Sequence, residues 1–308
     1  MVDVPGVPAR EDLRGHLAMV FFAIFVAGSF SLGGRVANEI DPMALTFARL
    51  LLAALLLGLV ARSTGQLRRE AMVAPWRFAV LGGLYGAYFV LMFEGLKTAP
   101  PVSTAAVFTL TPVMAAGFGY LVMGQVLTPG IAVALAIGAI GALWVIFGGD
   151  LDAALAFQIG RGEAIYFWGC LAHALYIPLV PRLSRGEGVF AFAMGTALGG
   201  AALVGLVGAR SIAGTDWGAL SLQVWLTLAY LSIFASAVSI ALVQFASRRL
   251  KAAKVMAYTY LVPSVVILWE IVLAGRLPPA IVLAGVGLTV LALLLLLREG
   301  RPPEAGGT

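Results

Sequence analysis

Thr104-Ala-Ala-Val-Phe-Thr-Leu-Thr-Pro112 begins the stretch of sequence that decides the fold, an apolar run that contains a proline and ends at Gly124. A second apolar run, from Val255 to Gly275, repeats it 151 positions later. The matched residues are Ala106 with Ala257, Leu110 with Leu261, Pro112 with Pro263, Phe118 with Trp269 and Gly124 with Gly275. Because this offset is close to half of the 308 residues, we predict that the chain consists of two copies of one unit.

Each copy places a proline inside an apolar run that is long enough for a helix. Proline has no backbone N–H, so it frees the carbonyl four residues earlier, here near Phe108 and Thr259. We expect helix breaks at Pro112 and Pro263, and a third at Pro178. In a membrane protein, broken helices at corresponding places in two halves point to a transport site.

The composition excludes a soluble domain with a polar surface. Hydrophobic residues make up 61% of the chain, charged residues 11%, and the mean hydropathy is +0.99. Apolar runs of about 20 residues suit membrane-spanning α-helices and do not suit the alternating pattern of a membrane β-barrel. We therefore predict an all-α integral membrane protein with ten transmembrane helices, at about 16–34, 43–61, 77–97, 101–123, 129–148, 162–181, 189–208, 223–246, 253–274 and 279–297.

The basic residues indicate how the chain lies in the membrane. Ten spans put both termini on one side, and the segments on that side carry fourteen of the twenty Lys and Arg residues. Five lie on the opposite side, and Arg49 lies within the second predicted span. Cytoplasmic segments are enriched in Lys and Arg, so both termini are predicted to be cytoplasmic. The net charge of +5 is explained by this topology, and we expect no nucleic-acid partner.

Five helices per half make the repeat an inverted one, because an odd number forces the second copy to enter the membrane from the opposite side. Such halves are related by a pseudo-two-fold axis in the membrane plane, with a site near the midplane. The predicted organisation is a cytoplasmic tail at 1–15, repeat one at 16–148, a loop at 149–161, repeat two at 162–297 and a disordered cytoplasmic tail at 298–308.

Aromatic side chains recur on several predicted spans. On the third span Tyr85, Tyr88, Phe89 and Met92 follow helical spacing, so one face presents an aromatic stripe. Such a face can stack on a flat ring, although ordinary packing or an interfacial aromatic belt would also explain it. Further ring side chains are Trp168, His173 and Tyr176 on the sixth span, and Tyr258, Tyr260 and Trp269 on the ninth.

Polar side chains on the eighth span have two explanations. Ser232, Ser236 and Ser239 lie at i, i+4 and i+7 and are followed by Gln244. Small hydroxyl residues on one stripe permit close helix packing. The alternative is the polar wall of a water-filled cavity.

Ionisable residues inside spans are costly in a bilayer and are candidates for function. The sequence contains Arg49, Glu94, His173 and Glu270 in such places. Glu94 is close to a helix end, and Arg49 could be structural, paired or directed toward the interface. Glu270 follows Pro263 by two turns, so it and His173 are the candidates for proton coupling.

Several chemical signatures are missing from the sequence. There is no His/Cys/Asp/Glu spacing for a metal, no P-loop and no G-x-S-x-G motif, so we expect no catalytic residue, no metal, no cofactor and no enzymatic activity. The single cysteine, Cys170, rules out an intrachain disulfide framework. The first span has no interior carboxylate, which a proton-coupled exporter of cationic drugs would need.

Three features of the chain are the two five-helix halves, the Pro42-Met-Ala-Leu-Thr-Phe-Ala-Arg49 sequence, and the Ala-x3-Leu-x-Pro runs that end at Pro112 and Pro263. In these three features the chain resembles the EamA branch of the drug/metabolite transporter superfamily. The resemblance covers nearly the whole chain. One departure concerns the Gly-Glu pair that members often carry after the fourth and ninth helices, where this chain has Gly124-Gln125 and Gly275-Arg276.

Within the superfamily the chain resembles the YddG-type exporters of aromatic amino acids. This resemblance implies a ten-helix monomer in the bacterial inner membrane, in contact with lipid, that exports amino acids by alternating access through a central cavity. Other cargoes (nucleotide-sugars, purines or lipophilic cations) and a non-transport sensor, channel or intramembrane enzyme remain alternatives. The candidate substrate-binding residues are Tyr85, Tyr88, Phe89, Phe108, Trp168, His173, Tyr176, Ser239, Gln244, Tyr258 and Tyr260.

Overall fold

The computed structural model describes residues 9–67, 73–124, 126, 128–156, 159–247, 252–275 and 277–299, and the secondary structure in these ranges is helical. Ten helical spans are long and apolar enough to cross a membrane, as predicted. Six are single helices: α1 (Ala9–Val36), α2 (Pro42–Ser63), α3 (Trp76–Leu96), α6 (Pro129–Ile146), α8 (Arg161–Leu183) and α9 (Val189–Val207). A seventh single helix, α15 (Ala280–Glu299), ends the described chain.

The other three spans are interrupted. The fourth is α4 (Pro101–Phe108) with α5 (Thr111–Met123), and the eighth is α11 (Leu222–Ser232), a π-helix η2 (Ile233–Val238) and α12 (Ser239–Ser247). The ninth is α13 (Ala252–Ala257), a 3₁₀ segment η3 (Tyr258–Leu261) and α14 (Val262–Ala274). Two short helices, α7 (Leu151–Leu155) and α10 (Ala209–Gly214), lie in connections between spans.

The two repeated segments have the same local geometry. Leu110 (φ −77°, ψ −16°) and Leu261 (φ −79°, ψ −20°) stand at the N-caps of α5 and α14, each two residues before a proline that sits in the first turn. Both helices end at a glycine in the left-handed region, Gly124 at φ +66° and Gly275 at φ +61°. The interruption of each span before its proline follows from the lost N–H and the steric limit that proline imposes on the preceding turn.

The predicted break at Pro178 is wrong. The helix α8 runs without interruption from Arg161 to Leu183 and contains both Pro178 and Pro181. Helix α8 packs against α3, α4 and α5, and Pro178 is buried in the bundle. Packing of this kind along a helix offsets the loss of one backbone hydrogen bond, so a proline alone does not determine a break.

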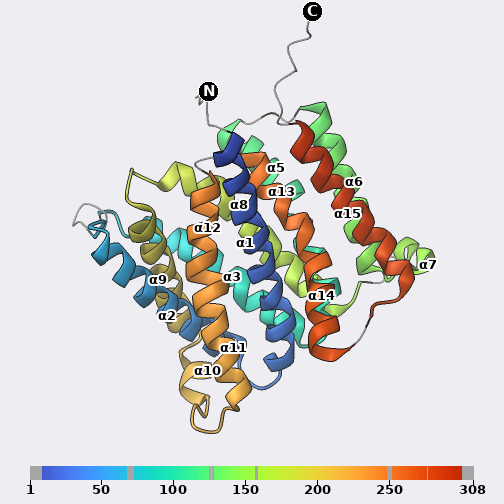
Figure 1. The fold of residues 1–308 in the computed structure, drawn as a ribbon. Helices are drawn as coiled ribbons and strands as arrows, with labels where there is room; N and C mark the ends of the chain where they lie inside the picture. Colours follow the sequence, from blue (N-terminus) through green and yellow to red (C-terminus); the bar gives the residue numbers. More distant parts are fainter. Residues whose placement is uncertain are drawn as a thin grey trace, which may run out of the picture.

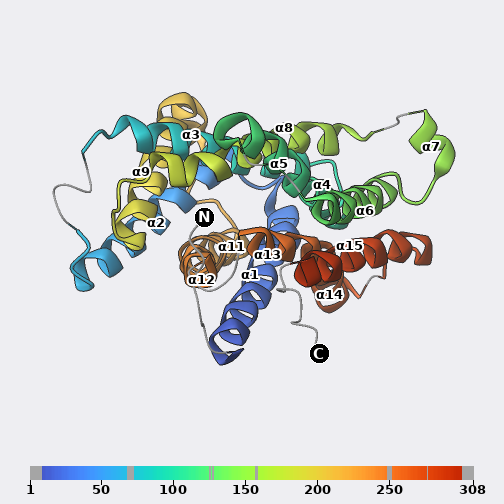
Figure 2. The ribbon, with the colours of Figure 1, turned by 90° about the horizontal axis from the view of Figure 1, so that it is seen from above.

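Contacts between the spans follow the expected two-fold relationship. Corresponding spans of the two halves pack on each other: α2 on α9, α4 on α14 and α6 on α15. The contact of α3 with α8 has its counterpart in the contact of α1 with α12. Seen from above, α2, α3 and α9 gather at one side of the molecule and α6 and α15 at the other (Figure 2). The start of α1 and the end of α15 lie at the same end of the bundle (Figure 1).

Glycines allow the backbones of paired spans to approach closely. A Cβ on Gly82 of α3 would lie 2.1 Å from the backbone nitrogen of Gly200 on α9. A Cβ on Gly141 of α6 would lie 2.6 Å from the carbonyl oxygen of Gly285 on α15. Small residues hold helices together in lipid because close backbone approach replaces the hydrophobic drive of water.

An ion pair fixes the start of α3 to the loop between α8 and α9. Arg77 lies 2.7 Å from Glu187, and both side chains are almost fully buried. Arg77 also donates hydrogen bonds to the carbonyl oxygens of Leu183 (2.5 Å) and Val73 (2.7 Å). Burial opposes the ionisation of Glu187, but hydrogen bonds from the Arg185 backbone N–H and from Arg77 outweigh it and lower the pKa of Glu187.

Candidate functional site

A stack of four nearly parallel rings forms where α3 meets α8. The ring centroids of Tyr88 and His173 are 4.5 Å apart at an interplanar angle of 29°, and those of Tyr85 and Tyr176 are 5.4 Å apart at 28°. His173 and Tyr176 are 5.8 Å apart at 14°, which joins the two pairs. Because α3 belongs to the first half and α8 to the second, the stack lies at the junction of the two repeats.

Besides Phe89, three more aromatic rings surround this stack. Phe108, the last residue of α4, lies 5.9 Å from both Tyr88 and His173. Tyr166 of α8 donates a hydrogen bond of 3.2 Å from its hydroxyl to that of Tyr88. Phe30 of α1 contacts both Phe108 and Tyr166. The cluster therefore includes the end of the broken fourth span, and we call these seven residues together the aromatic cluster.

Polar atoms within the cluster have unused hydrogen-bonding capacity. The Nδ1 atom of His173 is buried and has no hydrogen-bond partner among the described residues. Outside the cluster, the hydroxyl of Thr111 in the first turn of α5 faces the Cys170 thiol and has no nitrogen or oxygen partner among the described residues. The side chains of Tyr85, His173 and Tyr176 are only partly buried. A ligand that offers both a ring and polar groups could satisfy such a surface.

Arg49 lies next to the cluster on α2 and is fully buried. Its guanidinium stacks 3.6 Å above the centroid of Phe89, whose ring contacts Tyr85 at 4.6 Å and Tyr88 at 4.7 Å. Its Nε donates to the Ser236 hydroxyl at 2.9 Å and its Nη2 to the carbonyl oxygen of Ala235 at 3.1 Å, both on the π-helix η2. Phe89 thus connects a buried cation to the ring stack.

Trp168 lies away from the cluster, contrary to its place among the predicted site residues. It is 62% exposed, and its ring contacts Phe167, its neighbour in the chain. The positions that share the buried face of α8 are Tyr166, Cys170 and His173, at helical spacing. Trp168 is about 200° around the helix from Tyr166 and therefore points outward.

Tyr258 and Tyr260 also lie elsewhere, in other packing clusters. The hydroxyl of Tyr258 shares a hydrogen bond of 2.8 Å with Nδ1 of His16 on α1. Tyr260 packs against Gly138 of α6, where an added Cβ would lie 2.4 Å from its ring. The structure therefore gives both tyrosines packing partners away from the ring stack, and does not bring them to it.

The polar residues predicted on the eighth span are only partly in the site. Ser239 donates its hydroxyl to the carbonyl oxygen of Phe234, five residues earlier in the π-helix. Ser236 contacts Arg49, whereas the side chain of Gln244 lies outside the described part of the chain. Glu270 is on α14, with one carboxylate oxygen buried and without a hydrogen-bond partner among the described residues.

The substrate-binding residues predicted from the sequence did not include Tyr166, Phe30 or Arg49. A signal existed for Tyr166, because it precedes His173 by seven residues and so shares its helix face. No local signal marks Phe30, since α1 contains several phenylalanines and its flanking residues, Ser29 and Ser31, are small residues that permit helix packing.

A groove of about 650 Å³ runs between α2, α9 and α12. It is lined by Leu56, Leu57, Val60, Gln66, Val189, Phe190, Ala237, Val238, Ala241, Leu242 and Phe245. Leu56 and Val60 are on the same face of α2 as Arg49, at i+7 and i+11. Ala237 follows Ser236 directly, so the inner part of the groove borders the residues that hold Arg49.

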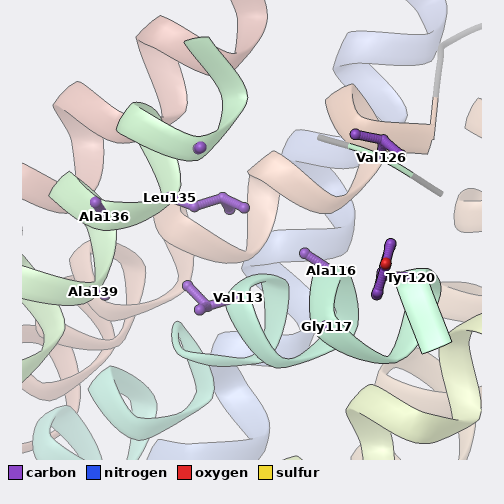
Figure 3. A pocket seen from close by; sticks show the side chains of 9 residues that line it. Val113, Ala116, Gly117, Tyr120, Val126, Leu135, Ala136 and Ala139 are labelled. Atoms are coloured by element: carbon purple, nitrogen blue, oxygen red, sulfur yellow. The ribbon is translucent and has the colours of Figure 1, made fainter. Parts of the chain in front are cut away.

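A second hollow, of about 480 Å³, lies between α5 and α6 (Figure 3). Its lining residues are Val113, Ala116, Gly117, Tyr120, Val126, Ala132, Leu135, Ala136 and Ala139. Apart from the Tyr120 hydroxyl these side chains are apolar, so the hollow offers little to hold a polar group. None of these residues belongs to the aromatic cluster.

The described residues contain no group of three or more His, Cys, Asp or Glu side chains that could hold a metal ion. Cys170 is a free, buried thiol on α8. The site is therefore made of rings, hydroxyls, one imidazole and one guanidinium.

Comparisons with known proteins agree with this architecture. The model of the EamA-like transporter family matches residues 13–147 and again 160–298. A relative from Bacillus subtilis (strain 168), described as "Uncharacterized transporter YyaM", is 25% identical over 233 residues, which cover 73% of this chain and 75% of that protein. A crystal structure of another protein superposes with a TM-score of 0.69 at 19% identity, covering 96% of this chain and 99% of that one, and supports the fold alone. The chain is a multi-pass membrane protein of the drug/metabolite transporter type and belongs to the EamA-like transporter family.

Proposed function

We propose that this transporter exports amino acids, aromatic ones included, across the bacterial inner membrane by alternating access. The observation that carries the proposal is the ring stack of Tyr85, Tyr88, His173 and Tyr176 at the junction of the two halves. Inverted-repeat transporters hold their substrates at such junctions. The direction of transport rests on the resemblance to YddG-type exporters.

The stack is suited to a flat, partly polar substrate. Offset stacking and edge contacts with Tyr85 or Tyr176 would hold an aromatic side chain, each contact contributing about 0.5–1.5 kcal/mol. The imidazole of His173 and the nearby hydroxyls would form hydrogen bonds with the polar head. A smaller amino acid would use the polar groups and lose the stacking.

Packing differences between two symmetry-related interfaces support alternating access. Helices α3 and α9 pack with their backbones in direct contact: a Cβ added to Gly199 would lie 2.2 Å from the carbonyl oxygen of Phe78. At the symmetry-related interface of α2 with the eighth span, a groove opens along α2 and α12 instead. Two related interfaces in different states, one packed and one open, are what an inverted-repeat transporter uses to open each side in turn. The basic residues favour the cytoplasm for the end at which the groove and Gln66 lie.

Transport into proteoliposomes tests this function. The purified chain, reconstituted as the predicted monomer, should take up labelled tryptophan and threonine with saturation, and a pH gradient should show whether protons are coupled. Tyr88→Ala should reduce tryptophan uptake about 2- to 10-fold more than threonine uptake, because one ring contact is lost. Trp168→Ala, at a 62% exposed ring, is the matched control and should leave both rates unchanged. Absence of amino-acid flux under every gradient would refute the proposal.

One carboxylate oxygen of Glu270 is buried without a hydrogen-bond partner among the described residues, which favours a second cargo, lipophilic cations. A carboxylate inside a span is the group expected to bind them or to couple protons to their movement. Loss of cation transport in Glu270→Gln with amino-acid transport intact would assign a cation role to this residue. Unchanged transport of both would remove it from the mechanism.

A further inference from the structure

The guanidinium of Arg49 has no counter-ion among the described residues. Its side chain is fully buried, and it takes no part in the ion pairs of Arg77 with Glu187 and of Lys97 with Glu94 within the described chain. Two of its nitrogen atoms donate to neutral oxygens of the π-helix, and the third, Nη1, has no hydrogen-bond partner within the described residues. The Arg49 side chain is thus a buried cation with one donor atom unused.

Such an arrangement is costly unless an anion completes it. Burying a charge without a partner costs several kcal/mol, and neutral acceptors and a cation–π contact recover only part of that free energy. Arginines inside membrane spans are rare and are therefore candidates for ligand or ion binding. The planar guanidinium of arginine matches the geometry of a carboxylate especially well.

A groove lies close to the buried surroundings of Arg49. Thr46, one turn earlier on the same face of α2, is fully buried and its hydroxyl also has no partner among the described residues. Ala53, Leu56 and Val60 continue this face, and the last two line the groove between α2 and α12. Seven residues of helix separate Arg49 from Leu56, which is a distance of about 10 Å. A substrate in the groove would therefore have only a short distance to travel to the guanidinium.

We propose that Arg49 binds the carboxylate of the transported substrate through its free Nη1 donor. This inference rests on the proposed function and narrows it to carboxylate-bearing substrates. Phe89 lies between Arg49 and the rings of Tyr85 and Tyr88, so one molecule can place its carboxylate on Arg49 and its ring on the stack. The site then selects aromatic carboxylates over amines and over lipophilic cations.

Competition in proteoliposomes that contain the full chain tests the selectivity without any variant. Indole-3-propionate keeps the ring and the carboxylate, whereas tryptophanamide and tryptamine keep the ring and the amine. Indole-3-propionate should inhibit the uptake of labelled tryptophan at least tenfold more strongly than tryptophanamide or tryptamine. Equal inhibition by tryptophanamide would overturn the assignment.

Variants then identify the residue. Arg49→Gln should weaken the binding of indole-3-propionate about 10- to 100-fold, because the loss of a hydrogen bond between charged groups lowers the affinity by about that factor. Arg49→Lys keeps the charge and should retain part of the binding, and it replaces Arg49→Gln if that variant does not fold. Arg35→Gln removes an exposed positive charge in the last turn of α1 and is the control that should bind normally. Unchanged binding in both Arg49 variants would refute the role of this residue.

The outcomes separate this inference from the proposed function. If tryptophan is not transported but indole-3-propionate raises the unfolding temperature of the wild type and not of Arg49→Gln, the carboxylate site stands and amino-acid export is wrong. If tryptophan is transported but its amide competes equally well, export stands and the role of Arg49 is wrong.

Discussion

Replacement of Gly82 by alanine should separate α3 from α9. A Cβ at this position would lie 2.1 Å from the Gly200 nitrogen and 2.4 Å from the Thr196 carbonyl oxygen, both backbone atoms. Ordinary contacts begin at 3.4 Å, so the two helices would have to move apart by about 1.3 Å. Overpacking of this kind costs about 1–3 kcal/mol or more, and the higher helix propensity of alanine returns only about 1 kcal/mol.

The neighbouring residue provides the control. A Cβ on Gly83 would meet only the end of the Leu203 side chain, at 2.9 Å, which can rotate away. Thermal unfolding of the two variants in the same detergent, followed by size-exclusion chromatography after heating, should give a lower midpoint for Gly82→Ala and a near wild-type midpoint for Gly83→Ala. Equal midpoints would show that α3 and α9 are not packed as described.

Three further predictions concern stability. The folded-state pKa of Glu187 lies below its unfolded value of about 4.3, so the stability that this carboxylate contributes is fully present above that pH and is lost as the pH falls through the folded pKa. In a series of thermal melts at falling pH, the wild type should lose stability below about pH 4.3, and Glu187→Gln should lack that part of the loss. Gly124→Ala should lower the free energy of unfolding by about 1–2 kcal/mol, because the backbone φ of Gly124 is +66°. Gly117→Ala is the control, since no atom lies within 4 Å of the new Cβ, and it should not lower the free energy of unfolding. Similar melting temperatures for the two variants would contradict this prediction. Tyr260→Phe should leave the melting temperature unchanged, since the buried hydroxyl has no hydrogen-bond partner among the described residues, and a clear decrease would reveal a partner.

The broken helices could be predicted because their causes are local. A proline in the first turn and a glycine in the left-handed region are read directly from Pro112, Gly124, Pro263 and Gly275. The same rule fails at Pro178, where packing of α8 against its neighbours keeps the helix continuous. The π-helix in the eighth span had no local marker either, and it places Ser236 beside Arg49.

The aromatic stripe on α3 was recognisable from spacing, and the structure places Tyr85, Tyr88 and Phe89 together with His173 and Tyr176. Trp168, Tyr258 and Tyr260 were assigned to the same site on residue type alone, and they face other surroundings. In a soluble protein the polar face of a helix would have distinguished the inner side from the outer. In a membrane protein both sides are apolar, so the sequence pattern does not give the direction of a ring.

The sequence by itself determined the membrane class, the ten spans and the two-copy organisation, because these depend on the length of apolar runs, on proline and glycine, and on an offset of half the chain. The tertiary structure decided which side chains meet. The ring stack is completed by side chains from spans that are far apart in the sequence: Phe30 on α1, Arg49 on α2 and Tyr166 on α8. Glycines let the backbones of these spans pack closely enough for the side chains to meet. Such contacts depend on helix rotation and crossing, which are set by partners on other spans and not by the residues next to them in the chain.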